Sequence, residues 1–170
     1  ALGWHIKGEM GGIWNHPIKL MDGFDVEMVV NGQVLALSKA SEFVNYPYAN
    51  KHVFEFIEED LIIERIQFVP DSVQGILIQF VIKNNNTKKI DGNVKFTGHT
   101  NLRPTWLGER SNMMDSKDSA AFHDNYWIVK DSANTWYTIF GSDQRPISSD
   151  ELKNSEKPNG VSNSLEFVVT

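Results

Sequence analysis

The residues best suited to chemistry lie near the start of the chain, within residues 8–24. This stretch combines glycines with Trp14, His16, Lys19 and Asp22. An aromatic ring offers an apolar platform on which a pyranose can stack, and Asp and His side chains can hydrogen-bond its hydroxyls. The alternative is structural, because glycines in β proteins often mark bulges that carry an aromatic side chain into the core. Both interpretations remain open at this point.

A second mixture of aromatic and polar residues spans residues 97–110, where it follows a strand-like run. One interpretation is a long structured loop that covers an edge of a sheet. The other is a loop that contacts a sugar or another domain, with Arg103 and Trp106 as its contact residues.

Other kinds of catalytic or metal site find little support in the sequence. The five histidines show no His-x-His or His-x-x-x-His spacing and the chain has no cysteine, so a zinc site would need ligands from distant segments. Carboxylate pairs such as Glu58 with Glu59, or Asp22 with Asp25, would have to lie about 5 to 10 Å apart across a cleft to cleave a glycoside. Nucleophile-elbow, phosphate-loop and dinucleotide motifs are not found. The sequence therefore predicts no metal, no cofactor and no catalysis by this chain alone.

Strand and turn signals dominate the elements that would position these residues. Residues 24–37 are two apolar runs around Asn31-Gly32, the pair that favours a type I′ hairpin turn. Similar patterns predict three further strand pairs: residues 52–56 with 61–69, 73–83 with 92–100, and 125–130 with 135–141.

Aromatic residues cluster in the last of these pairs: Tyr126, Trp127, Trp136 and Tyr137. Successive side chains alternate between the faces of a strand, so only half of this cluster can face a core. The other half would be exposed, either as ordinary cross-strand pairs or as a binding platform.

Helical signals are confined to residues 148–153, where Ser148 and Glu151 have the spacing of a capping box and predict one short helix. Residues 143–163 otherwise read as a long exposed loop. The fold class predicted is all-β, a large antiparallel β-sandwich of supersandwich type with at most one or two short helical turns.

Composition fits one globular domain spanning residues 1–170, with 41% hydrophobic and 22% charged residues. A formal charge of −6 argues against a nucleic-acid partner, and no apolar run reaches the roughly 18 residues of a membrane span. The chain begins without Met and ends on a strand-like run, residues 165–170. We therefore expect it to be part of a longer polypeptide.

The run Gly-Gly-Ile-Trp-Asn-His-Pro-Ile-Lys-Leu-Met-Asp-Gly-Phe at residues 11–24 resembles the N-terminal β-sandwich of bacterial glycogen-debranching-like and related glycoside hydrolases. The motif covers about the first 30 residues, and the likeness beyond them is one of strand pattern. In such enzymes the catalytic carboxylates lie in a following (α/α)6 barrel.

The resemblance implies a non-catalytic N-terminal accessory domain, whose partner is the C-terminal (α/α)6 catalytic domain of the same polypeptide. It makes Trp14, His16, Lys19 and Asp22 candidates for contact with that domain or with sugar at the rim of its cleft. It also favours a periplasmic or extracellular location if the parent enzyme is exported.

Two other functions remain open. The chain could be an independent carbohydrate-binding module that grips an oligo- or polysaccharide with an aromatic platform, or a small β-sandwich hydrolase that uses scattered carboxylates. An accessory domain should expose a large apolar patch, whereas a binding module should expose a small solvated aromatic platform.

Overall fold

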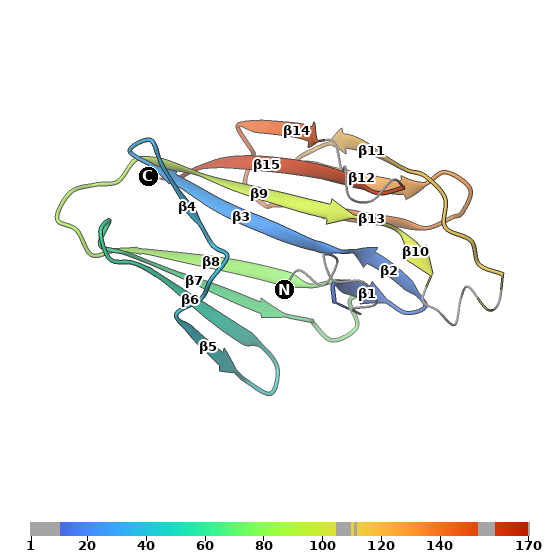
Figure 1. Cartoon of the computed structure of the whole chain (residues 1–170), viewed down its shortest axis with the longest axis horizontal. Helices are drawn as coiled ribbons and strands as arrows, with labels where there is room; N and C mark the ends of the chain where they lie inside the picture. Colours follow the sequence, from blue (N-terminus) through green and yellow to red (C-terminus); the bar gives the residue numbers. More distant parts are fainter. Residues whose placement is uncertain (1–10, 105–109, 111, 153–158, 170) are drawn as a thin grey trace. The chain divides into compact units, whose positions relative to one another are not determined.

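The computed structural model describes residues 11–104, 110, 112–152 and 159–169 (Figure 1). Fifteen strands are described in these ranges, and every strand pairing whose register is given is antiparallel. The prediction of an all-β, antiparallel protein is therefore confirmed. Within the described residues, no helix has the length and apolar character needed to cross a membrane.

The strands form four sheets. Their bounds are β1 Ile13–Asn15, β2 Ile18–Met21, β3 Gly23–Val30, β4 Gln33–Ala36, β5 Glu42–Asn45, β6 Asn50–Phe56, β7 Leu61–Phe68, β8 Leu77–Asn84, β9 Gly92–Thr100, β10 Arg103–Pro104, β11 Asp118–His123, β12 Tyr126–Asp131, β13 Tyr137–Gly141, β14 Ser148–Leu152 and β15 Val161–Val169. The strand orders are β1-β2-β10, β11-β12-β13, β14-β15-β9-β3-β4 and β5-β6-β7-β8.

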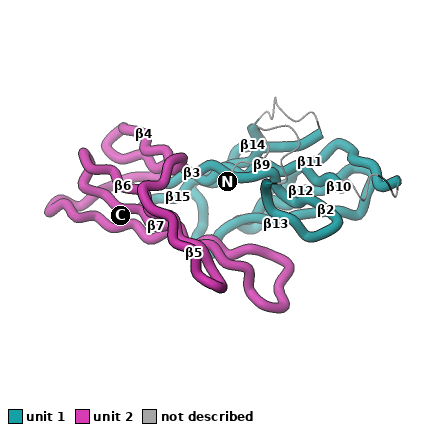
Figure 2. The backbone as a smooth tube through the Cα atoms, turned by 60° about the horizontal axis from the view of Figure 1, so that its bottom comes forward, with its two compact units in different colours: residues 1–25, 94–168 teal, residues 26–93, 169–170 magenta. Residues whose placement is uncertain are grey.

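The chain divides into two compact units (Figure 2). Unit 1 comprises residues 1–25 and 94–168, and unit 2 comprises residues 26–93 with 169–170. Face-to-face packing of the sheets as one sandwich domain, which the sequence suggested, stays a prediction.

Unit 2 contains the two hairpins that the sequence predicts most directly. Strands β3 and β4 pair around Asn31 and Gly32, whose φ angles of 51° and 81° are both positive, as a type I′ turn requires. Strands β6 and β7 pair in register from Asn50↔Gln67 to Phe56↔Leu61. Both predictions are confirmed.

The pairing predicted between residues 73–83 and 92–100 is wrong. Strand β8 pairs with β7, from Leu61↔Asn84 to Phe68↔Leu77, whereas β9 belongs to the five-stranded sheet. The pattern of apolar residues predicts where the strands lie but not which strands pair. An apolar strand such as β8 can pair with the edge strand of any sheet whose register matches its own.

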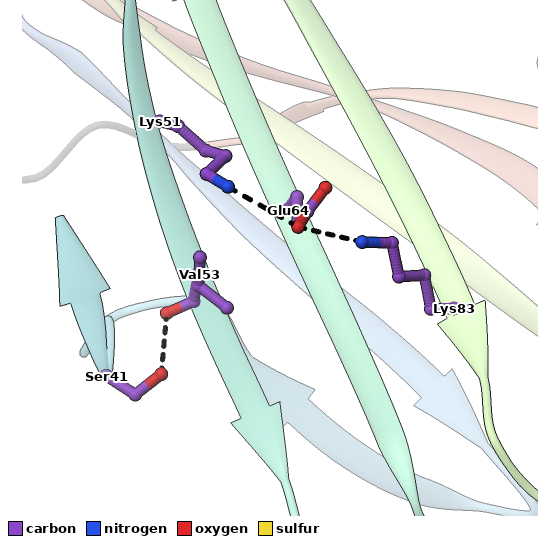
Figure 3. A network of polar contacts seen from close by, with 5 residues as sticks. All are labelled: Ser41, Lys51, Val53, Glu64 and Lys83. Atoms are coloured by element: carbon purple, nitrogen blue, oxygen red, sulfur yellow. Dashed lines mark hydrogen bonds and ion pairs between the residues drawn. The ribbon is translucent and has the colours of Figure 1, made fainter. Parts of the chain in front are cut away.

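Strand β7 of the four-stranded sheet in unit 2 alternates fully and partly buried side chains between its two faces. Leu61 and Ile63 in β7 are each only 1% exposed, while Glu64 points to the other side. Its Oε1 lies 2.8 Å from the Nζ of Lys83 and 3.6 Å from that of Lys51, on the two neighbouring strands (Figure 3). The hydrogen bond from Lys83 is the main reason that the pKa of Glu64 is lowered.

Unit 1 is built around a small apolar cluster of Leu102, Val129 and Val161. Partly buried side chains pack against it: Leu20, Ala120, Trp136 and Phe140. Strands β12 and β13 form the last predicted hairpin, which is confirmed. Trp127 is buried and donates a hydrogen bond from Nε1 to the Ser164 carbonyl oxygen at 3.0 Å.

The helix predicted at residues 148–153 is also wrong, since Ser148–Leu152 is strand β14 and pairs with β15. The Ser148 hydroxyl donates to Glu166 Oε2 at 3.0 Å instead of capping a helix. A helix of one or two turns is marginal by itself, whereas pairing with β15 satisfies the same backbone groups. The predicted loop at residues 143–163 is consequently interrupted by β14 and by the start of β15. Residues 153–158 lie outside the described part of the chain.

Candidate functional site

The segment that the sequence singles out folds as a tight hairpin, β1–β2. Trp14 pairs with Lys19 and Asn15 with Ile18 across a turn at His16-Pro17, whose peptide bond is cis. Gly12 precedes the hairpin with a φ of 117°. A Cβ at this position would collide with the Met21 carbonyl oxygen and would lie 2.6 Å from Lys19 Cε. Only glycine fits here, because the position requires both a positive φ and close approach of the backbone.

Lys19 and Asp22 form a buried ion pair behind this hairpin. The Lys19 Nζ lies 2.7 Å from Asp22 Oδ1, and the two side chains are 0% and 1% exposed. The same Nζ lies 5.3 Å from the centre of the Trp14 ring, within the range of a cation–π interaction. The backbone N–H of Asp22 donates to the His99 carbonyl oxygen at 2.7 Å, which ties the pair to β9.

The structure brings four of the predicted contact residues into one region. Trp14 is half-buried, and Arg103, also half-buried, stands opposite Lys19 where β10 pairs with β2. Because Lys19 and Asp22 are buried, they support the surface of this region rather than form it.

Of the remaining two predicted residues, one lies in the turn of the same hairpin and the other falls outside the described residues. His16 is exposed in the hairpin turn, and Trp106 lies outside the described residues. Contact of this region with a sugar or a neighbouring domain stays a prediction.

A buried carboxyl group, Asp118, was missed by sequence reasoning. It is 2% exposed, and its Oδ2 accepts a hydrogen bond from the Leu102 N–H at 2.9 Å. Its pKa is raised to about 7, mainly by burial and also by the neighbouring carboxylates of Asp115, Asp131 and Asp22, against the effect of the Leu102 hydrogen bond. The signal that could have found it is the alternation in β11, which places Asp118 on the same side as Ala120 and opposite the exposed Ser119.

A second constellation missed by sequence reasoning is a row of Ser162, His99 and Asp25. His99 Nδ1 lies 2.9 Å from Ser162 Oγ, and His99 Nε2 lies 2.9 Å from Asp25 Oδ2. The three residues belong to β15, β9 and β3, which are neighbours in the five-stranded sheet. The residue types are those of a Ser-His-Asp triad, but the ring nitrogens are exchanged, because in the triad Nε2 faces the serine and Nδ1 faces the aspartate.

The exposure of this row is opposite to what nucleophilic catalysis requires. A serine nucleophile must reach the substrate, whereas Ser162 is 4% exposed and the Asp25 side chain is 49% exposed. The arrangement is therefore better suited to joining three adjacent strands by side-chain hydrogen bonds than to attacking an ester or glycoside.

The sheet β11-β12-β13 carries an exposed apolar face. The pairing places Ile128 beside Ile139 and Tyr126 beside Gly141, while Tyr137 lies on the same side. Tyr137 is 60% exposed, Ile139 53% and Tyr126 41%. We call Tyr126, Ile128, Tyr137 and Ile139 the outer apolar face.

The aromatic cluster thus divides as the alternation of a strand predicts, with Trp127 buried and Tyr126 exposed. Tyr126 lies over Gly141, since a Cβ at that position would collide with the tyrosine ring.

Among the residues that the structure describes, no three His, Asp or Glu side chains are grouped so that they could hold a metal ion. No protein-family model, curated protein or solved structure matches the chain.

Proposed function

We propose that this chain is a non-catalytic accessory domain of a glycoside hydrolase of the glycogen-debranching-like kind, docked on an (α/α)6 catalytic domain. The observation that supports this proposal most is the outer apolar face of β11-β12-β13. Tyr137 and Ile139 are both more than half exposed there, next to Ile128 and Tyr126 on the same side of one sheet. Contiguous apolar patches with aromatic side chains are typical of surfaces that bind another protein.

The surroundings of the face fit the same role. His123 and Lys130, both exposed, lie on the same side of the sheet as the apolar residues. Protein interfaces commonly combine an apolar centre with a polar rim. The buried Ser162 gives the chain no accessible serine nucleophile in the row with His99, which agrees with a supporting role.

Association with the catalytic domain tests the proposal. Ile139→Ser removes an exposed apolar side chain from the face and should weaken binding of this chain to the separately expressed catalytic domain by roughly tenfold or more, because side chains central to an interface carry most of its affinity. Isothermal titration calorimetry measures the dissociation constant.

The control is Ile57→Ser, because Ile57 is 87% exposed in unit 2 and lies outside the face. It should leave the affinity unchanged. Equal affinity of wild type and Ile139→Ser would refute docking through the outer apolar face, and failure of the wild-type chain to bind would refute the accessory role itself.

The exposed ring of Tyr126 beside Gly141 favours a second candidate, an independent carbohydrate-binding module. A tyrosine ring held against Gly141 presents the kind of apolar platform on which a pyranose stacks. If this function is correct, the wild-type chain should be retarded in native gels that contain a soluble α-glucan, and Tyr126→Ala should abolish the retardation. Ile139→Ser should then have little effect, because an aliphatic side chain does not stack with a sugar ring.

A further inference from the structure

Asp118 lies where three separate segments of unit 1 meet, at the first residue of β11. Its carboxyl Oδ2 accepts from Leu102 N–H at 2.9 Å, and its own N–H donates to the Asn159 carbonyl oxygen at 2.7 Å. Among the described residues, Oδ1 of Asp118 has no hydrogen-bond partner although it is buried. A buried carboxylate oxygen without a donor is costly, whereas a neutral carboxyl group at the same place is much less so.

Three neighbouring carboxyl groups from separate segments act on Asp118 through their negative charges. They are Asp115 from the preceding residues, Asp131 from the end of β12 and Asp22 from the bend between β2 and β3. The basic groups of the region are directed to other acids, because Lys19 binds Asp22 and the positive charge of Arg103 acts on Asp115.

The carboxylate of Asp131 already accepts four hydrogen bonds. It accepts from the N–H groups of Ser116, Ala133 and Asn134 at 3.0, 2.9 and 2.7 Å, and from the Asn134 side-chain amide at 2.8 Å. These bonds close the turn between β12 and β13 and hold the residues before β11 against it. Asp118 has only one such donor, so its carboxyl oxygens are less fully hydrogen-bonded than those of Asp131.

We propose that Asp118 is a proton-controlled latch: the start of β11 packs stably beside Leu102 and Asn159 while the carboxyl group is neutral. Ionisation would place a negative charge, with one unpartnered oxygen, among three acidic neighbours, and this cost outweighs the stronger hydrogen bond that Leu102 N–H makes to a carboxylate. The inference concerns the chain's own conformation and does not rest on the proposed function.

The direction of the pH dependence follows from the environment of the group. Burial raises the pKa of Asp118 in the folded chain to about 7 from an ordinary value of 3.8. Because the folded-state pKa lies above the unfolded one, the neutral form favours folding. The stabilisation is complete below about pH 4 and is lost as the pH rises to about 7.

Denaturant titrations at pH 5 and pH 8 test the latch. The unfolding equilibrium constant of wild type should rise about 100-fold more between these pH values than that of Asp118→Asn. Asparagine mimics the neutral acid, since its carbonyl can still accept from Leu102 N–H. The matched control is Asp150→Asn, because Asp150 is exposed on β14 and its replacement should leave the wild-type pH response intact.

A second measurement on the wild-type chain covers the case in which Asp118→Asn fails to fold. The NMR signal of the Leu102 amide, which donates to Asp118, should shift with a midpoint near pH 7. Asp115→Asn removes one neighbouring negative charge and should move that midpoint to lower pH. A Leu102 amide that does not titrate between pH 5 and 9, or parallel pH responses of wild type and Asp118→Asn, would overturn the proposal.

Discussion

Lys19 illustrates, at the scale of single residues, how a charge can lie inside a small β protein. Its ammonium group is fully buried, and it is neutralised by Asp22 and covered on one side by the Trp14 ring. A buried ion pair adds little to the net stability of the folded protein. Removing one partner destabilises the protein strongly, because it leaves the other charge buried without a counter-charge.

We therefore expect Lys19→Met to lower the free energy of unfolding by about 3 to 5 kcal/mol, because it leaves Asp22 buried without a counter-charge. Chemical denaturation at pH 7 measures the change. Lys83→Met is the matched control, since the Lys83 side chain is 49% exposed and an exposed pair contributes only about 0 to 1 kcal/mol. A loss for Lys19→Met no larger than that control would show that the pair is not buried in solution.

The sequence drew attention to Lys19 and Asp22 but could not show that they bind each other. A spacing of three residues brings side chains together on a helix, whereas on a continuous strand it places them on opposite faces. The contact exists because Asp22 sits in a bend between β2 and β3 and turns back toward β2. The burial of Asp118 could not be predicted for a related reason, because it depends on contacts with Leu102 and Asn159, which are distant in sequence.

Elements were predictable where the signal was local. The Asn31-Gly32 turn specifies its own hairpin through backbone conformation, and the structure shows the positive φ angles that it requires. Strand β14 was mistaken for a helix because a capping box is a local signal and the pairing with β15 is not. The partner of β8 was missed for the same reason, because neither β7 nor β9 is distinguishable as its neighbour from the pattern of apolar residues.

The hairpin turn offers a clean test of backbone conformation. Gly32→Ala should lower the free energy of unfolding by about 1 kcal/mol, because φ at Gly32 is 81° and an L side chain is disfavoured there. The new methyl group itself meets nothing within 4 Å, so no steric clash contributes.

Gly75→Ala is the control for this substitution. Its Cβ would lie 3.8 Å from Val73 Cγ1, an ordinary contact, and its φ is not in the left-handed region. It should be neutral or slightly stabilising, because alanine reduces the freedom of the unfolded chain. Equal losses for both variants in thermal melts would contradict a conformational cause at Gly32.

For the molecule as a whole, the property to test is whether the isolated chain hydrolyses α-glucans. We expect the purified chain to release no reducing sugar from α-glucans, because the serine of the triad-like row among the described residues is buried. Ser162→Ala should then change the thermal stability of the chain without changing its lack of activity on α-glucans. Turnover by the wild-type chain that disappears in Ser162→Ala would replace the accessory proposal with a hydrolase.

The order of synthesis gives the division into two units a further consequence. Unit 2 is almost one continuous stretch, residues 26–93, whereas unit 1 is made from residues on both sides of it. On the ribosome nearly all of unit 2 emerges before the partners of the β1–β2 hairpin exist, since His99 and Arg103 follow later. We therefore expect the nascent β1–β2 hairpin to lack its neighbouring strands, and Lys19 and Asp22 to stay in contact with water, until some 80 further residues have been translated. We expect the two charged side chains to keep this segment soluble during synthesis, until β9 and β10 have been made and can pack against it.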